Sequence, residues 1–451
     1  MSKIKHLYWR AGFGLSPQEW EKRKNWPVTK AVDQLFKEAK AAGPLQALHV
    51  SSVTSKPTKE QRKMERKYVG RQNTAWLMRM ANPNESAFME RMSLFWHGHF
   101  ACSSKLSKLA FNQINAIREH ALGNFRDLVL AVAKDSSMIR YLNNQQNKKN
   151  KPNENFAREL MELFTIGRGH YTEQDIKEAA RAFTGWSSNL SGSFVFRRRQ
   201  HDFGVKTFMG RTGKFDGDEI IDIILEQRAT AQFICTKIYR YFVNEKVDTK
   251  IVNQLADQFY KSDYNIEALM RNIFTSDWFY DKKNIGIKIK SPVDLLAGMS
   301  RGLNVQYDNE QALIFAQKAL GQVLFNPPNV AGWAEGKAWI DNSTMMLRLN
   351  LITYLLYASD IDFRTKSDLK ASSRNKAMRK LEARVNLAPL QQILSTNDQE
   401  RTIEELSDFL LQRDPAVDKK LIQQYAQSGT GQDFMKMAIA RITSLPEYQL
   451  C

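Results

Sequence analysis

Cysteine is scarce in this chain. Among 451 residues the cysteines are Cys102, Cys235 and Cys451. They cannot all pair with one another, and none belongs to a C-x-x-C arrangement. This pattern excludes a disulfide-rich scaffold and a zinc site built from cysteine alone.

Long apolar runs are also missing. No segment approaches the roughly 20 consecutive apolar residues that a membrane-spanning helix needs. The opening residues MSKIKHLYWRAGFG are partly basic, but neither an apolar segment nor a small-residue cleavage site follows them. The sequence as written therefore predicts a cytoplasmic protein without a membrane span, unless a leader has been removed.

Acidic residues are outnumbered by basic ones. The chain has 66 Lys and Arg against 48 Asp and Glu, which gives a formal net charge of +18. The basic residues concentrate in segments 55–71, 147–151 and 196–200. This balance favours an anionic partner, such as an acidic polymer or a nucleic acid. A solvated basic face is the simpler interpretation of scattered runs without interleaved aromatics.

Helical periodicity dominates what is present. Apolar residues recur at steps of three and four through most of the chain, for example in AFMERMSLFW and AQFICTKIYRYFV. The glycine-rich stretch at about 191–217 instead alternates apolar and polar residues, as a hairpin does. We expect a mainly α, multi-helix globular protein with one small β-hairpin or sheet insertion. A polar loop suggests a main body over 1–365 and a C-terminal helical region over 366–451, packed on the body.

The segment NENFARELMELF, residues 153–164, combines carboxylates with an apolar stripe. On a regular α-helix Asn155, Glu159 and Glu162 share one ridge beside that stripe. Glu159 and Glu162 are therefore candidate catalytic carboxylates, with Glu154, Asn155 and Arg158 placed to orient them. The alternative is a structural lattice in which Arg158 ties Glu154 and Glu162 together.

An H-x-H motif follows the apolar helix near residue 95. His97 and His99 flank Gly98 and could present two imidazoles to one divalent metal, with Glu159 as a further ligand. We expect both histidines to converge with Glu159 or Glu162 in one cleft. The alternative is a buried histidine bonded to a carbonyl group.

The β excursion adds a second set of candidates. His201 and Asp202 could supply a base or a ligand to the same catalytic centre, or they could form only a turn. The glycine-containing turn that follows carries three cations suited to anion binding, namely Lys206, Arg211 and Lys214. Its spacing is not that of a phosphate-binding P-loop, and no dinucleotide fingerprint is present.

Two tryptophans follow a rigid proline turn in LFNPPNVAGWAEGKAW. Trp333 and Trp339 could form the wall of a pocket or stack on a sugar ring. A packed core loop explains the same residues equally well.

Several motifs in order resemble one known family. They are HLYWRAGFG, ERMSLFWHGHF, PNENFARELMELFTIG, EAARAFTGW, HDFGVKTFMGRTG and LFNPPNVAGW. Together they resemble, over nearly the whole chain, the bacterial family catalogued as domain of unknown function 1800. The resemblance implies a mostly helical protein, frequent secretion, and frequent genetic pairing with a sulfatase- or phosphatase-like protein. It implies no catalytic residues.

Two functions from different classes follow. The first is a metal- or carboxylate-dependent hydrolase acting on an anionic or carbohydrate-like substrate. The second is a non-catalytic binding companion of a sulfatase- or phosphatase-like partner, or a basic protein that binds a polymer or nucleic acid.

Overall fold

The computed structural model confirms the mainly α fold. It describes residues 2–47, 58–189, 191–307, 310–357, 383–395, 398–426 and 431–451. None of the helices in these ranges combines the length and apolar character that crossing a membrane requires. The predicted boundary between residues 365 and 366 lies outside the described residues.

The α-helices within these ranges are α1 (Lys3–Arg10), α2 (Pro17–Arg23), α3 (Val28–Lys40), α4 (Lys59–Ala81), α5 (Ala87–His99), α6 (Ser107–His120), α7 (Phe125–Ala133), α8 (Ser136–Tyr141), α9 (Asn155–Glu159), α10 (Glu173–Ala182), α11 (Gly217–Leu225), α12 (Arg228–Phe242), α13 (Thr249–Lys261), α14 (Ile266–Thr275), α15 (Pro292–Leu303), α16 (Glu310–Leu320), α17 (Asn342–Leu356), α18 (Ala388–Gln391), α19 (Gln399–Leu410), α20 (Lys419–Gln424) and α21 (Gln432–Thr443). A π-helical turn, η2 (Leu160–Thr165), continues α9, and short 3-10 turns include η6 (Gly336–Trp339).

Strands form three two-stranded antiparallel sheets in the described part of the chain. The strands are β1 (Trp186–Ser188) with β2 (Phe194–Phe196), β3 (Lys206–Phe208) with β4 (Arg211–Gly213), and β5 (Val305–Tyr307) with β6 (Ala383–Val385). The predicted β excursion thus holds β2, β3 and β4, with β1 just before it. The β5–β6 pair joins segments far apart in the sequence, so no local alternation revealed it.

The helix starts are strongly specified by side chains. At four helix starts, the side chain of the residue before the helix accepts a hydrogen bond from the backbone N–H of the third helical residue. The side chain of that third residue accepts a hydrogen bond from the backbone N–H of the residue before the helix. These starts are at Ser16, Thr172, Asp216 and Ser291. Such reciprocal caps satisfy N–H groups that have no partner within the helix, and each cap is worth about 1 kcal/mol.

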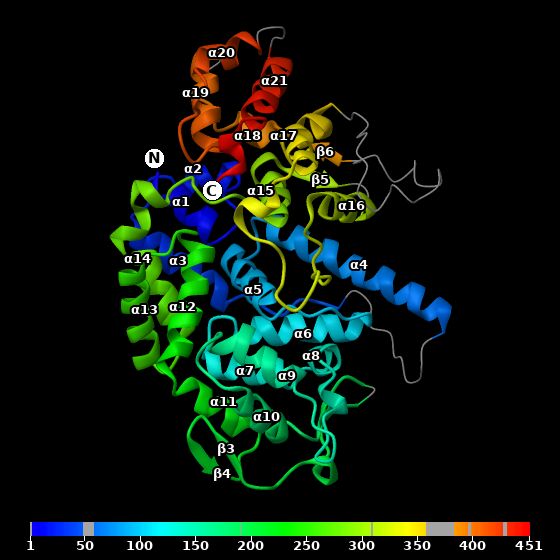
Figure 1. The fold of residues 1–451 in the computed structure, drawn as a ribbon. Helices are drawn as coiled ribbons and strands as arrows, with labels where there is room; N and C mark the ends of the chain where they lie inside the picture. Colours follow the sequence, from blue (N-terminus) through cyan, green and yellow to red (C-terminus); the bar gives the residue numbers. More distant parts are fainter. Residues whose placement is uncertain are drawn as a thin grey trace.

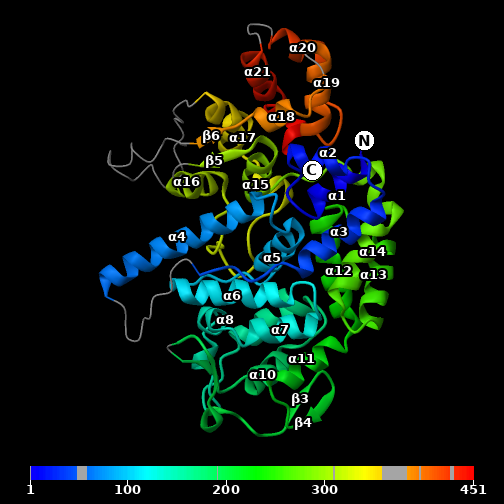
Figure 2. The ribbon, with the colours of Figure 1, turned by 180° about the vertical axis from the view of Figure 1, so that it is seen from behind.

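Two apolar cores organise these elements. The first collects α1, α3 and the helices from α7 to α14, and the second collects α4, α15–α17 and α19–α21. Helices α5 and α6 contribute to both cores and lie between them, as Figure 1 shows for α5 near the centre of the molecule. The C-terminal helices therefore share a core with α15–α17. Figure 2 shows the first half of α4 extending away from both cores.

A fully buried carboxylate fixes α5 to its neighbours. Glu90 accepts hydrogen bonds from Trp76 Nε1 (2.8 Å), Arg79 Nε (2.9 Å) and Arg118 Nη1 (2.6 Å). Buried charges persist when they are paired in this way. Glu90, which precedes His97 by two turns, thus serves α4 and α6.

Candidate functional site

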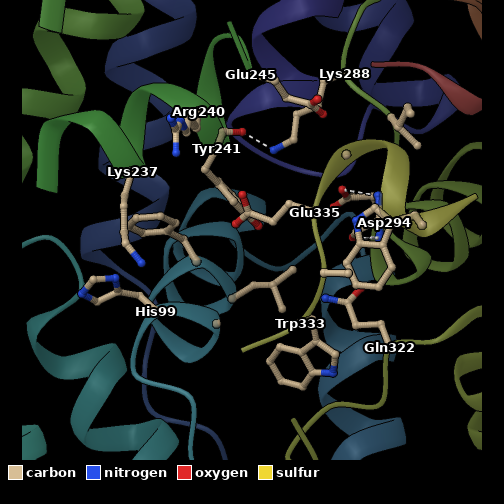
Figure 3. A pocket seen from close by; sticks show the side chains of 18 of the residues that line it. His99, Lys237, Arg240, Tyr241, Glu245, Lys288, Asp294, Gln322, Trp333 and Glu335 are labelled. Atoms are coloured by element: carbon tan, nitrogen blue, oxygen red, sulfur yellow. Dashed lines mark hydrogen bonds between the residues drawn. The ribbon is translucent and has the colours of Figure 1, made fainter. Parts of the chain in front are cut away.

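A cleft of about 290 Å³ opens where the two cores meet. Its walls come from the end of α5, the end of α12, the segment before α15, and the loop that leads to η6. Figure 3 labels most of its polar lining residues, namely His99, Lys237, Arg240, Tyr241, Glu245, Lys288, Asp294, Gln322 and Glu335, together with Trp333. Clefts between structural units are common ligand sites.

The last turns of α12 supply one wall. Lys237 and Tyr241 are one helical turn apart and half-buried, whereas Arg240 is exposed at the rim. Burial lowers the pKa of Lys237, and the nearby Glu335 carboxylate opposes this shift. Lys237 has no carboxylate within 4.0 Å among the described residues, so its ammonium group is available to a ligand.

Lys288 faces this wall from the segment before α15. Its backbone pairs with the final residues of the described chain, where Cys451 N donates to Lys288 O at 2.8 Å. The ammonium group donates to the Tyr241 carbonyl and lies 3.9 Å from the centroid of the Tyr241 ring. Burial lowers the pKa of Lys288 to about 8, and Asp294 opposes the shift. Like Lys237, Lys288 forms no ion pair with a described carboxylate.

A buried ion pair supports both lysine-bearing walls. Arg91 on α5 pairs with Asp294 on α15, and it donates to Tyr241 Oη at 3.3 Å and to the Gly12 carbonyl. Burial alone would raise the pKa of Asp294, but Arg91 and Lys288 lower it below its usual value. Asp294 is therefore a charged support, already engaged by Arg91, whereas neither lysine forms an ion pair with a described residue.

His99 forms part of the cleft lining at the end of α5. It is 7% exposed, and its Nε2 atom lies 2.9 Å from the Phe164 carbonyl oxygen. Burial lowers the pKa of His99 well below its usual range, and Lys237 lowers it further. The imidazole is therefore neutral near pH 7.

The loop before η6 closes the cleft. Trp333 and Trp339 both line it, which confirms that these tryptophans wall a pocket. Gly332 has φ +89°, and a Cβ atom there would lie 2.6 Å from the Gly98 carbonyl oxygen. A side chain at this position is excluded, which lets the loop pack directly against the end of α5.

His97 lies outside this cleft although it is two residues from His99. Its Nε2 atom accepts the Phe325 backbone N–H at 3.1 Å, and its ring packs among Trp76, Phe325 and Trp333. Burial lowers its pKa to about 3. The two histidines thus serve different backbone segments, as in the carbonyl-bonded alternative for His99.

The helix that carries Glu159 and Glu162 departs from the predicted regular α-helix. From Leu160 to Thr165 it widens into a π turn, so the ridge of three- and four-residue steps does not continue past Glu159. Glu162 pairs with Arg168, while Glu159 is half-buried and its pKa is raised by burial and by Glu162. The segment reaches His99 through the Phe164 carbonyl rather than through a carboxylate.

The residues expected to orient these carboxylates form a surface lattice. Arg158 donates to Glu173 on α10 (2.7 and 2.8 Å) and to Glu154 (3.2 Å). Asn155 Nδ2 donates to the Leu142 carbonyl at 3.1 Å. Arg158 thus ties Glu154 to α10. The sequence suggested Glu162 as the second carboxylate bound by Arg158, but that carboxylate is Glu173.

His201 and Asp202 lie in the turn between β2 and β3. His201 is buried, with Nδ1 2.8 Å from the Thr184 carbonyl oxygen, and Asp202 pairs with Arg181 at 2.8 Å. Neither residue lines the cleft. Their contacts close the turn onto α10.

The three cations of the predicted anion-binding turn have separate surroundings. Lys206 is 1% exposed and its ammonium donates to the carbonyls of Asp202 (2.7 Å) and Gly204 (3.1 Å). Arg211 pairs with Glu226, whereas Lys214 is exposed. These contacts do not assemble a common anion site.

No metal centre is assembled by the described residues. Nowhere in these ranges do three or more His, Cys, Asp or Glu side chains lie close enough to hold one ion. The described residues therefore do not show the expected convergence of His97 and His99 with Glu159 or Glu162 on one ion.

Pattern reasoning missed the lysines of the cleft. Lys237 interrupts the apolar segment AQFICTKIYRYFV, and a cation inside such a stretch could have indicated a binding residue. Lys288 lies in the short polar stretch KIKS before the Ser291 cap, which carried no such signal.

Fold and cleft together define a mainly helical protein with a lysine-lined cleft between two apolar cores. Residues 6–450 match the family model described as Protein of unknown function (DUF1800). The chain belongs to this family, in agreement with its motifs. No curated protein and no solved structure matches the chain.

Proposed function

We propose that the protein binds a small anionic ligand with a ring-shaped body in this cleft. The observation that carries the proposal is the pair of half-buried lysines, Lys237 and Lys288, for which the described residues supply no carboxylate partner within 4.0 Å. Half-buried ammonium groups without a carboxylate in ion-pair contact favour an anion from solution, because desolvated charges interact more strongly than exposed ones.

The size and aromatic lining support the ring-shaped body. A cleft of about 290 Å³ lies just below the range for small-molecule sites, roughly 300–1,000 Å³, which suits a ligand as small as a single sugar ring. Trp333 and Trp339 offer flat apolar faces in the same cleft. Tryptophan faces pack well against rings whose edges are polar.

Binding of charged probes tests this proposal. Titration calorimetry should show binding of glucuronate and glucose 6-phosphate and none of neutral glucose. Lys237→Met and Lys288→Met should each weaken binding about tenfold or more, since a hydrogen bond to a charged group is worth roughly 1.5–3 kcal/mol. Lys214→Met, the same substitution in the sequence-predicted anion turn, is the matched control. Loss of binding in that control alone would transfer the site to the β excursion.

We propose hydrolysis as the reaction, with Glu335 as the acid–base residue. Glu335 stands near Lys237 and Tyr241, and Figure 3 shows its carboxylate directed into the cleft between them. A carboxylate near a held anionic substrate can activate a water molecule or protonate a leaving group. The assay is release of 4-nitrophenol from its phosphate, sulfate and β-glucuronide, with Glu335→Gln as the test and Glu162→Gln as the control. Equal turnover in both variants would reject this role for Glu335.

The first half of α4 favours a second function, binding of an extended polyanion. Its exposed cations fall at helical steps of three and four, and none forms an ion pair with a described residue; they are Lys59, Arg62, Lys63, Arg66 and Lys67. Glu65, on the opposite face, accepts the Ser107 N–H at 2.7 Å and fixes this half of α4 to α6. The stripe thus faces away from the body.

Salt dependence tests the polyanion function. Replacing Arg62 and Arg66 by Gln should weaken binding to heparin and lower the slope of log affinity against log salt by about 1 for each lost contact. An unchanged slope would show that α4 is not the contact surface. The sulfatase- or phosphatase-like partner expected from the family resemblance stays a prediction.

A further inference from the structure

His99 has one ring nitrogen with a fixed role. Its Nε2 atom faces the Phe164 carbonyl oxygen at 2.9 Å, and a carbonyl oxygen can only accept a hydrogen bond. Nε2 therefore carries the proton of the neutral imidazole. The other nitrogen, Nδ1, then presents a lone pair as an acceptor.

That acceptor is unused. Nδ1 of His99 is buried and has no hydrogen-bond partner among the described residues. Buried polar atoms nearly always have a partner, so an orphaned one in the wall of a cleft points to a group that arrives from outside. His99 is 7% exposed and belongs to the cleft lining, so this buried atom lies on a side chain that borders the site.

Lys237 is the neighbouring group. Figure 3 shows the Lys237 side chain directed toward the His99 ring from the wall above it. The lysine is half-buried, and no described residue accepts a hydrogen bond from its ammonium group. A lysine side chain is flexible, so Lys237 can turn toward a bound anion and leave room for the ligand beside the His99 ring.

Resting on the proposed anion site, we infer that Nδ1 of His99 accepts a hydrogen bond from a hydroxyl group of the ligand. The ligand is then a hydroxylated ring that carries an anionic group, such as a sugar acid or a sugar phosphate. Lys237 and Lys288 hold the anionic group, and His99 distinguishes a ring with hydroxyl groups from one without them. A site that pairs with a hydroxyl group discriminates against the analogue that lacks it.

Two ring carboxylates provide the test. Glucuronate and cyclohexanecarboxylate share a six-membered ring and a carboxylate, but only glucuronate has hydroxyl groups. Titration calorimetry of the full chain should show glucuronate binding about tenfold more tightly, the order expected for one hydrogen bond in a buried site.

His99→Gln is the informative variant. The glutamine amide can reach the position of Nε2 and keep the bond to the Phe164 carbonyl, while it leaves no acceptor at the position of Nδ1. This variant should bind both probes with the lower affinity of cyclohexanecarboxylate. His170→Gln replaces an exposed histidine outside the cleft and should keep the wild-type preference. Lys237→Met should weaken both probes together.

The outcomes separate this inference from the proposal beneath it. Wild-type protein without a preference, or a preference retained in His99→Gln, overturns the role of His99 while Lys237→Met still reports on the anion site. Absence of binding for both probes overturns the anion site itself. If His99→Gln does not fold, ¹⁵N NMR of the wild type decides: glucuronate, but not cyclohexanecarboxylate, should shift one unprotonated imidazole nitrogen. If glucuronate shifts no imidazole nitrogen, the inference is overturned.

Discussion

Replacement of Glu90 by Gln should be among the most destabilising single-atom changes in the molecule. The side chain is 0% exposed, and two arginines and Trp76 donate to it. Glutamine keeps one acceptor oxygen and the shape of the side chain, but it removes the charge. Arg118, whose side chain is 3% exposed, then loses the only carboxylate within 4.0 Å among the described residues.

The size of the destabilisation depends on which arginine is left without a carboxylate partner. Breaking a buried ion pair by removing one partner typically costs about 3–5 kcal/mol, because the remaining charge stays buried. Arg79 is spared, since it also pairs with Glu85 at 2.8 Å. We therefore expect a loss of about 3–5 kcal/mol in the free energy of unfolding, caused mainly by Arg118.

Urea unfolding followed by tryptophan fluorescence measures this loss. The double variant Glu90→Gln with Arg118→Met should be more stable than the sum of the single effects predicts, because no charge is left unpaired. Glu85→Gln, which removes a partly exposed partner of Arg79, should cost less than about 1 kcal/mol. A cost below about 1 kcal/mol for Glu90→Gln, or additive single effects, would refute the reasoning.

Three further predictions concern the titration of two lysines and a comparison of His97 with Glu159. Because the pKa of Lys288 is about 8, its charged fraction falls from about 90% at pH 7 to about 10% at pH 9, so glucuronate affinity should drop about tenfold. Calorimetry should show this drop in the wild type and none in Lys288→Met. Burial lowers the pKa of Lys290 from 10.5 to about 7, so between these values the unfolded chain binds more protons and stability rises with pH. In Lys290→Met that part of the rise in urea midpoint should disappear, and an unaltered pH profile would contradict the assignment. His97→Phe removes the acceptor of the Phe325 N–H and should cost about 1–3 kcal/mol, whereas half-exposed Glu159→Gln should change stability by less than about 0.5 kcal/mol. Thermal unfolding compares the two variants. A larger loss of stability in Glu159→Gln than in His97→Phe would show that Glu159 is the more important residue for the fold.

Local patterns predicted the parts of this molecule that local physics determines. Helical periodicity and alternation gave the mainly α fold and the β excursion, because each depends on side chains within a few residues of one another. The aromatic residues after the proline turn were also informative, since Trp333 and Trp339 do line a cleft.

The candidate site was harder because long-range contacts assemble it. Lys237 and Lys288 are 51 residues apart in number and line the same cleft, where Lys288 contacts Tyr241, and no spacing rule encodes that contact. The ridge expected for Glu159 and Glu162 assumed a period of 3.6 residues, and the π turn breaks that period within the same helix. A hydrophobic pattern cannot reveal such a turn, because the buried residues remain apolar on either side of it.

The π turn also makes the hydrogen bond of His99 dependent on the number of residues in this helix rather than on which side chains they carry. A π turn accommodates more residues than the α turn it replaces, and here its Phe164 carbonyl meets the imidazole. Most exchanges of side chains within residues 160–165 would leave that carbonyl in place. Deletion of a single residue there would return the helix to α spacing and withdraw the carbonyl from the ring. In related chains, the number of residues in this helix should therefore vary less than the residues themselves.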